Sequence, residues 1–452
     1  MSPAIDLDLS TPELTHLTSG DAVVSRTIHP SGLRILTEQV PGAHSTSLGF
    51  WIAVGSRDED EVAFGSTHFL EHLLFKGTRH RTALDIAIAF DSVGGEHNAL
   101  TAKEHTCYYA KVQDIDVPMA IEVLSDMLAD SVLDAHEFEV ERQVILEELA
   151  MADDDPSDVA HERITELVFG SHPLGRPIGG NPETIRAATR DSVVEHYRSY
   201  YCPSELVVTA AGALEHQDIV DKVVAGLTQA GWDLSTTSEP AARRETQPAT
   251  LQRVTPTQVI NRPLEQAVVA LATPGLLAND ARRYQMAVLS SVLGGGMSSR
   301  LFQEIREKRG LAYSVYSFQS SYADAGMFGM AAGTSPASAA EVARLLAGEL
   351  ELVAHAGITS AELARTAGNL AGASALALES SDTRMMRLGR SELITGEYVD
   401  RDEALARFAE VNESDVQNLA QSLVEQPLSG VVVGKVSEKV FDEVSHLTGV
   451  SL

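Results

Sequence analysis

Residues 106–128, TCYYAKVQDIDVPMAIEVLSDML, and residues 327–350, MFGMAAGTSPASAAEVARLLAGEL, share one pattern. Each begins with an apolar run typical of a strand, continues through a turn, and ends in an amphipathic segment typical of a helix. The comparison sets Glu122 opposite Glu341. Two such segments roughly 220 residues apart indicate an internal repeat.

A second pair of segments follows in the same order. Residues 191–214, DSVVEHYRSYYCPSELVVTAAGAL, resemble residues 413–436, ESDVQNLAQSLVEQPLSGVVVGKV, with Gly212 opposite Gly434. Each reads as a helix followed by a buried strand. Chance similarity between amphipathic segments is the alternative, but the common order favours an α+β fold built from two duplicated halves.

The halves are predicted to cover residues 22–230 and 262–452, joined by a linker over residues 231–261. Residues 235–253, STTSEPAARRETQPATLQR, have the Ser, Thr, Pro and charge content of an exposed linker, and the hinge is expected there. Residues 1–21 are expected to be a short disordered head. The chain contains no Lys or Arg before Arg26, which is unlike a signal or transit peptide.

Composition narrows the class of protein. The chain has 452 residues, too many for one ordinary core, and 34 basic against 64 acidic side chains give a net charge of −30. This balance argues against nucleic acid as a partner and favours cationic partners or simple solubility. The two cysteines, Cys107 and Cys202, form no disulfide framework. No apolar run approaches the roughly 20 residues that span a bilayer, so we expect a soluble, cytoplasmic protein that does not bind membranes.

The strongest chemical signal lies in residues 65–78, GSTHFLEHLLFKGT. On a helix, side chains four residues apart share one face, so His68 and His72 can direct imidazole nitrogens at one metal ion. Glu71 shares that side, where a carboxylate can take a proton from water and later deliver it to a leaving amine. Two partly exposed histidines beside an ordinary glutamate are the alternative interpretation.

A catalytic zinc needs three protein ligands, so a further ligand is expected. Residues 137–151, EFEVERQVILEELAM, offer Glu141, Glu147 and Glu148 within two turns of a helix. Glu141 and Glu148 are seven residues apart and share a face, whereas Glu147 points about 100° away and is expected to be solvated.

Val144 and Ile145, one turn before Glu148, predict that this face turns toward the core. A carboxylate buried there needs a cation or a donor. Glu148 is therefore the better ligand, and Glu141 the better partner for a ligand histidine or a bound substrate. A charged face with incidental spacing is the alternative.

With these residues in place, the chain resembles the pitrilysin group of inverted-motif zinc peptidases, above all the branch of the mitochondrial processing peptidase and its bacterial relatives. The resemblance rests on the HxxEH motif at His68, Glu71 and His72, and on ERQVILEE, in which Glu141 and Glu148 match the family's ancillary glutamate and third ligand. It implies a zinc endopeptidase with one Zn²⁺ per chain. It also implies two halves, each a mostly antiparallel sheet flanked by helices, facing each other as a clamshell around a chamber.

The resemblance implies roles for four more residues. Residues 92–109, SVGGEHNALTAKEHTCYY, resemble the family's substrate-contacting edge strand, where Asn98 and Ala99 would hold the substrate main chain as an added strand. In the second half, Arg306 would anchor the substrate and Tyr313 would donate a hydrogen bond to the developing oxyanion.

Two further observations concern the second half. Arg309 and Tyr316 repeat the interval between Arg306 and Tyr313, and only the resemblance selects between the two pairs. The helix expected at residues 279–293, which should correspond to the metal helix, contains no histidine, so one half would carry the metal.

The predicted activity is hydrolysis of unfolded peptides or N-terminal extensions, with basic peptides favoured by the acidic charge. The resemblance suggests a homodimer. The alternative functions are a non-catalytic scaffold subunit of the same fold and a module that binds peptides without cleaving them. Both are disfavoured because no residue of the catalytic pattern is missing.

Overall fold

The structure is a computed structural model that describes residues 4–60, 64–252 and 255–444. The chain forms two compact units, each assembled from three stretches. The first unit consists of Met1–Leu149, Pro177–Arg243 and Ser374–Glu403, and the second of Ala150–Arg176, Arg244–Ala373 and Ala404–Leu452.

The first unit is built on a seven-stranded sheet, with β4 and β8 parallel and the other neighbours antiparallel. The strands in spatial order are β2 (Glu13–Leu17), β3 (Val23–Ile28), β4 (Arg34–Gln39), β8 (Leu206–Gly212), β5 (Ser45–Ile52), β7 (Thr106–Gln113) and β6 (Glu96–Thr101). All seven residues of β8, LVVTAAG, are buried, as expected for a central strand covered on both faces.

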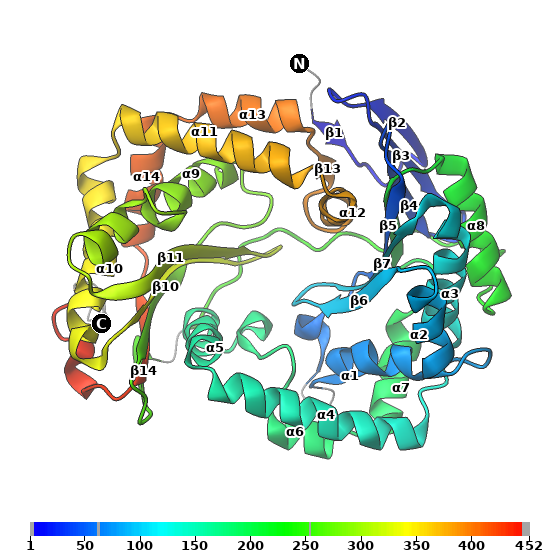
Figure 1. Ribbon diagram of the computed structural model, residues 1–452, viewed down its shortest axis with the longest axis horizontal. Helices are drawn as coiled ribbons and strands as arrows, with labels where there is room; N and C mark the ends of the chain where they lie inside the picture. Colours follow the sequence, from blue (N-terminus) through cyan, green and yellow to red (C-terminus); the bar gives the residue numbers. More distant parts are fainter. Residues whose placement is uncertain (1–3, 61–63, 253–254, 445–452) are drawn as a thin grey trace. The chain divides into compact units, whose positions relative to one another are not determined.

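Helices cover both faces of this sheet. In Figure 1, α3 and α8 lie side by side on one face, and α12, seen end-on, lies against β5. Together with a pair of two-residue strands, β1 (Ile5–Asp6) and β13 (Glu397–Tyr398), the unit contains α1 (Ser66–Leu73), α2 (Ala83–Asp91), α3 (Val117–Asp130), most of α4 (Ala135–Asp154), α6 (Pro182–Ala187), α7 (Arg190–Tyr200), α8 (His216–Gln229) and α12 (Ser381–Arg390).

The second unit repeats this plan on a five-stranded sheet. Its strands in spatial order are β11 (Ala312–Ser321), β12 (Gly326–Thr334), β10 (Ala267–Pro274), β14 (Ser429–Gly434) and β9 (Thr257–Asn261), with β14 and β9 parallel. Its helices are α5 (Pro156–Phe169), α9 (Arg283–Gly294), α10 (Ala339–Ala356), most of α11 (Ser360–Ala377) and α13 (Arg401–Glu410), and α14 (Glu413–Val424). Here α10 and α14 cover one face, and α5 packs on β10 and β14 (Figure 1).

The two sheets confirm the predicted duplication. The spatial order β6-β7-β5-β8-β4 has its counterpart in β11-β12-β10-β14-β9, including the parallel pair at the end. Gly212 and Gly434 both end a strand with a positive φ. The helices α3 and α10 begin at Val117 and Ala339, which sets Glu122 opposite Arg344 rather than the expected Glu341.

The compact units differ from the predicted contiguous halves. The predicted linker over residues 231–261 is wrong at its end, because Thr257–Asn261 form β9 of the second sheet. Residues 231–256 contain no helix or strand in their described part, and one unit boundary falls there, between Arg243 and Arg244. However, α5 belongs to the second unit and α12 to the first, so each sheet is covered by one helix from the other end of the chain.

The expected disordered head also differs from the structure. Residues 13–17 form β2, paired with β3, and Leu7 is fully buried. The guanidinium of the buried Arg26 donates to the carbonyls of Leu7, Asp8 and Thr11 at 2.7–2.8 Å. A buried guanidinium needs acceptors for its N–H groups, and this part of the head supplies them.

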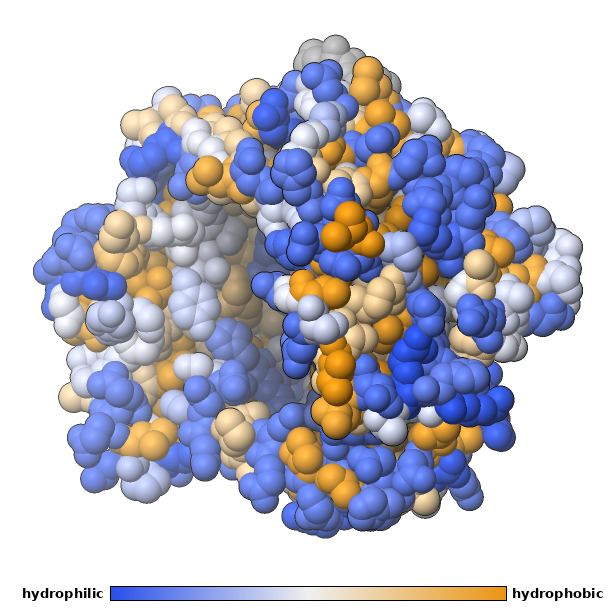
Figure 2. All heavy atoms as spheres, turned by 45° about the vertical axis from the view of Figure 1, so that its right-hand side comes forward, coloured by the Kyte–Doolittle hydropathy of each residue, from blue (hydrophilic) through white to orange (hydrophobic). Residues whose placement is uncertain are grey.

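The face shown in Figure 2 is mostly hydrophilic, with apolar side chains scattered over it. Both cysteines are free thiols. No helix within residues 4–60, 64–252 and 255–444 is long and apolar enough to cross a membrane.

Candidate metal centre and active site

The helix α1 begins at a defined cap. Gly65 adopts the left-handed conformation, at φ 90°, and Ser66 starts the helix. The carboxylate of Glu59 accepts the backbone N–H groups of Gly65 and Thr67 at 2.9 and 2.7 Å. These donors have no partner within the helix, and a negative charge at a helix N-terminus is favourable, so Glu59 fixes where α1 starts.

One face of α1 is buried and the other carries the motif. Phe69, Leu70 and Leu73 are buried in the core of the first unit, where α1 packs against α7 and β6. His68, Glu71 and His72 lie on the remaining side and are partly buried. The i, i+3, i+4 spacing thus places all three polar groups together, as the sequence predicted.

The structure brings the predicted ligand atoms together. Nε2 of His68 lies 3.3 Å from Nε2 of His72. Oε2 of Glu148 lies 3.6 Å from Nε2 of His68 and 3.4 Å from Nε2 of His72. Glu148 is 46% exposed, so the group faces solvent on one side and leaves room for a further ligand.

These separations fit a tetrahedral metal ion. Ligand atoms about 2.0–2.2 Å from a tetrahedral zinc lie roughly 3.3–3.6 Å from one another, which matches all three distances. Burial, together with neighbouring His72, lowers the pKa of His68, which favours the neutral imidazole that binds metals. The two histidines and one carboxylate are a donor set that zinc commonly takes.

Glu141 orients one ligand histidine. Its carboxylate is 2% exposed; Oε2 lies 3.0 Å from Nδ1 of His72, and Oε1 lies 2.7 Å from Nζ of Lys76. A hydrogen on Nδ1 donated to this carboxylate leaves Nε2 of His72 with a free lone pair toward Glu148 and His68. Lys76 balances the charge of the buried carboxylate.

Glu71 has its own positioning contact. The hydroxyl of Thr101, on β6, donates to Oε2 of Glu71. The base candidate is therefore held between α1 and the edge of the sheet.

On α4, Glu147 is exposed, as predicted. Of the two residues expected to turn this face of α4 toward the core, Ile145 is buried but Val144 is 39% exposed.

The predicted substrate strand is at the sheet edge. Among the described strands, β6 pairs only with β7, so its other edge lies outside the ladder. Asn98 is exposed and Ala99 is buried against the core. The Asn98 side chain accepts the Ala99 N–H at 2.8 Å.

In the second unit, Arg306 and Tyr313 contact each other. Arg306 lies on a π-helical turn, η5 (Phe302–Glu307), and donates to the Tyr313 carbonyl at 2.8 Å, with its guanidinium over the Tyr313 ring. The alternative pair is engaged elsewhere, because Arg309 pairs with Glu304 and Tyr316 contacts His161. Tyr313 is 81% exposed.

A second group of possible ligands has a structural explanation. His80, Asp126 and Asp130 lie close enough to share an ion. However, Asp126 accepts hydrogen bonds from Thr78 and Arg81 at 2.7 Å, and Arg79 pairs with Asp130 at 3.2 Å. These contacts hold the segment after α1 onto α3.

The chain was compared with known proteins. The family described as insulinase (peptidase family M16) matches residues 34–182, and the one described as peptidase M16 inactive domain matches residues 187–370. An uncharacterised zinc protease of Streptomyces coelicolor is 47% identical, covering 93% of this chain and 91% of that protein. This chain belongs to peptidase family M16.

Other relatives support the assignment to family M16. Uncharacterised zinc proteases of Mycobacterium tuberculosis and Bacillus subtilis are 43% and 38% identical, covering 92% and 89% of this chain and 94% and 96% of the relatives. A crystal structure of a peptidase M16 inactive domain from Pseudomonas fluorescens matches 94% of this chain and 98% of that one, with a TM-score of 0.81 at 19% identity. A protease from Helicobacter pylori matches 93% of this chain and 99% of that one, with a TM-score of 0.78 at 22% identity. These structures show the M16 fold.

Sequence reasoning missed several residues of this M16 site. Thr101 lies in the quoted edge-strand segment, two residues after Ala99, so its face on β6 could have been inferred from the alternation of a strand. Lys76 follows the motif by one helical turn. Glu59 and His196, which contacts Thr67 on α1, have no recognisable sequence pattern.

Proposed function

We propose that this chain is a zinc-dependent endopeptidase that hydrolyses unfolded peptides or N-terminal extensions. His68, His72 and Glu148 would hold one Zn²⁺, and Glu71 would be the catalytic base. The proposal is supported chiefly by the three ligand atoms separated by 3.3, 3.4 and 3.6 Å beside a carboxylate on the same helix. It is also supported by relatives that are named zinc proteases.

Each residue around the ion would have its own role in catalysis. When bound, zinc would supply Lewis-acid chemistry that makes water a stronger nucleophile near neutral pH. Glu71 would accept the proton of the attacking water and deliver it to the leaving amine. Glu141 would keep His72 in the tautomer that binds metal, and Thr101 would keep Glu71 oriented.

The substrate would be held as an added strand. The edge of β6 that pairs with no described strand would offer backbone groups to a peptide main chain near Asn98 and Ala99, which requires an extended substrate. Arg306 would anchor the substrate and Tyr313 would donate to the oxyanion, as the resemblance implies. The net charge of −30 supports basic peptides as substrates.

The test compares the wild type with Glu71→Gln. Cleavage of a quenched-fluorescent basic peptide and the zinc content are measured on both proteins. We expect the wild type to cut, the variant to be inactive, and both to hold about one zinc per chain, because the amide keeps the shape of Glu71 but accepts no proton.

The other outcomes discriminate between the alternatives. If both proteins hold zinc and neither cuts, the chain is a scaffold or a peptide-binding subunit. If the wild type holds no metal, the ligand assignment is wrong. Sedimentation of the same samples tests the proposed homodimer.

A further inference from the structure

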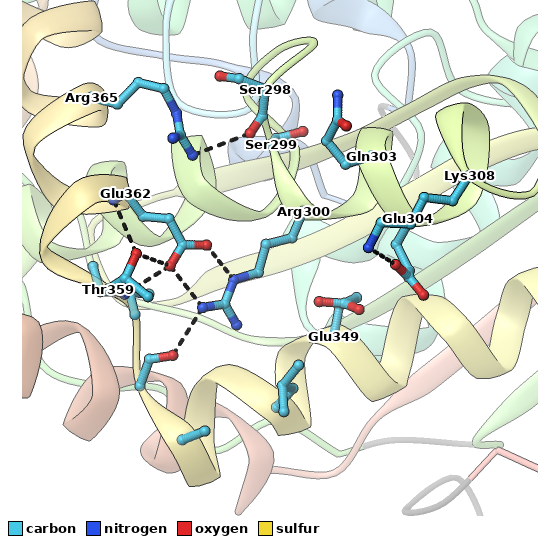
Figure 3. A pocket seen from close by; sticks show the side chains of 14 residues that line it. Ser298, Ser299, Arg300, Gln303, Glu304, Lys308, Glu349, Thr359, Glu362 and Arg365 are labelled. Atoms are coloured by element: carbon cyan, nitrogen blue, oxygen red, sulfur yellow. Dashed lines mark hydrogen bonds and ion pairs between the residues drawn. The ribbon is translucent and has the colours of Figure 1, made fainter.

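A cavity of about 840 Å³ lies within the second unit, among the turn after α9, the π-helical turn η5, α10 and the start of α11 (Figure 3). Its volume is in the usual range for small-molecule sites. None of the residues that line it belongs to the candidate metal centre, and all of them belong to the second unit.

Most charges around the cavity are already paired. Arg300 binds both carboxylate oxygens of Glu362 at 2.7 and 2.9 Å and donates to the Gly357 carbonyl at 3.0 Å. Lys308 pairs with Glu304 at 2.7 Å. Figure 3 shows these contacts as two separate groups of dashed lines. They make rigid walls and leave those four side chains little free charge.

Two opposite charges remain. Glu349, on α10, is half-buried and has no hydrogen bond or ion pair within residues 255–444, the described part of this region. Burial raises the pKa of this carboxyl group, as expected for an acid without a bound cation. Arg365, on α11, makes one contact in the same region, a hydrogen bond at 3.3 Å to the Ser298 carbonyl.

The rest of the lining combines apolar and polar groups. Leu352, Ala356 and Ile358 supply apolar surface next to Glu349. The hydroxyl of Ser299 is buried and has no hydrogen-bond partner among the described residues, although the residue lines the cavity. A buried hydroxyl without a partner is costly, and a bound polar group would satisfy it.

We infer that this cavity binds a zwitterionic ligand with an apolar part, the chemistry of a short peptide with both ends free. Its ammonium group would pair with Glu349, its carboxylate with Arg365, and its side chains would contact Leu352 and Ile358. A phosphate ligand would be attracted by Arg365 but repelled by Glu349, while the other charged side chains of the lining are paired with one another. The inference goes beyond the proposed peptidase activity and does not depend on it.

The test measures binding by calorimetry to the full chain carrying Glu71→Gln, so that the probe is not cut. The probes are the dipeptide Leu-Leu, its N-acetyl derivative and its C-terminal amide, with a chelator present so that no metal holds the probe. Each blocked probe should bind about threefold to tenfold more weakly than the free dipeptide, because it lacks one charge.

Two variants test which side chain binds each end of the ligand. In Glu349→Gln, N-acetylation should no longer weaken binding, whereas amidation still should. In Arg365→Gln the pattern should reverse, with the smaller effect because Arg365 is exposed. Glu351→Gln, two positions along α10 and outside the lining, is the matched control and should behave as the parent.

Each other outcome overturns the inference. It fails if Leu-Leu does not bind at millimolar concentration, if the three probes bind equally, or if Glu349→Gln responds to N-acetylation as the parent does. Thermal unfolding of each variant checks that the second unit remains folded. An inactive wild type would overturn the proposed peptidase function and leave this result unchanged.

Discussion

The helices α1 and α9 occupy corresponding places in the two units and bury the same pattern of residues. Phe69, Leu70, Leu73 and Leu74 correspond in spacing to Val288, Leu289, Val292 and Leu293, and all eight are buried. On the remaining side, His68, Glu71 and His72 correspond to Ala287, Ser290 and Ser291. The buried face was kept in both units, while the chemistry of the other face differs completely.

The contact to the edge strand differs in the same way. In the first unit, the Thr101 hydroxyl on β6 donates to the Glu71 carboxylate. In the second unit, Ser317 on β11 hydrogen-bonds the side chain and carbonyl of Ser290 on α9. A link from helix to edge strand therefore belongs to the scaffold, and only in the first unit does it hold a group that can transfer a proton.

The largest expected effect comes from removing a ligand. His72→Ala should abolish stoichiometric zinc binding and lower peptide cleavage by at least about a thousandfold, because two protein ligands hold the ion poorly. The matched change in the second unit, Ser291→Ala, should leave both zinc content and cleavage unchanged. Equal loss of activity in the two variants would mean that the two helices are not functionally different.

The helices α12 and α5, which cover the first and the second sheet, allow a test of side-chain packing. Any side chain at Gly389 on α12 would overlap the Trp51 ring on β5. By strand register, Ala272 in the second unit corresponds to Trp51. By the spacing of buried helix positions, Val168 on α5 corresponds to Gly389 on α12. The first sheet thus combines a large strand residue with no helix side chain, and the second a small strand residue with a larger helix residue.

Replacing Trp51 and Gly389 by the residues of the second unit should change the unfolding free energy in a non-additive way. Trp51→Ala alone should cost about 3–5 kcal/mol of unfolding free energy through the cavity it leaves. Gly389→Val alone should cost several kcal/mol by overpacking, but less than about 1 kcal/mol when Trp51 is already alanine. Urea unfolding of the four proteins measures this. Additive losses would show that the two residues do not share one space.

His196, on α7, predicts a pH-dependent stability. Burial lowers its pKa to about 4, partly opposed by Asp58 and Asp60. The unfolded chain binds this proton near pH 6.5 but the folded chain does not, so stability is full above about pH 6.5 and falls as the pH drops toward 4. The helix caps Thr189 and Asn412 set His196 opposite the buried Leu419 on α14, one position beyond the match in the sequence comparison.

We therefore expect His196→Leu to flatten the pH dependence. Between pH 7.5 and 5, the wild type should lose about 2 kcal/mol more unfolding free energy than the variant, both measured by urea titration with a chelator present. Parallel losses in the two proteins would assign the pH dependence to other groups.

The smallest expected effect concerns Thr101. Thr101→Val keeps the shape of the side chain but removes the donor to Glu71, so kcat should fall about tenfold with KM nearly unchanged. Thr101→Ser should retain most of the activity, and Ser317→Ala should retain all of it. A change confined to KM would show that Thr101 contacts substrate rather than orienting the base.

The sequence predicted the parts of the site that depend on local spacing. The HxxEH spacing correctly brought His68, Glu71 and His72 to one side of a helix, and the two-turn spacing on α4 put Glu141 and Glu148 on one face, where both contact His72. Helix geometry alone explains the shared face on each helix, whereas the meeting of α4 with α1 depends on tertiary packing. Strand alternation could have placed Thr101 on the same face of β6 as Ala99. Its contact with Glu71, and the contact of Glu59 with the start of α1, depend on tertiary packing, for which no local pattern exists.

The fold, too, was predictable where it depends on local sequence patterns. Each repeat pairs a helix with a strand close in sequence, so the duplication was visible, although the helix register differed by three positions at Glu122. The places of α5 and α12 depend on which sheet face remains to be covered, and the order of residues 1–21 depends on the buried Arg26. Neither leaves a periodic signal.

Because α12 lies far along the chain, it is synthesised well after the sheet that it covers. The last central strand of the first sheet, β8, ends at Gly212, but the helix that covers Trp51 ends at Arg390. At about 5–20 residues per second, a ribosome needs roughly 10–35 s to make the intervening chain. During that time the nascent first sheet has one apolar face without its own cover, which makes this stage a natural one for a chaperone to bind.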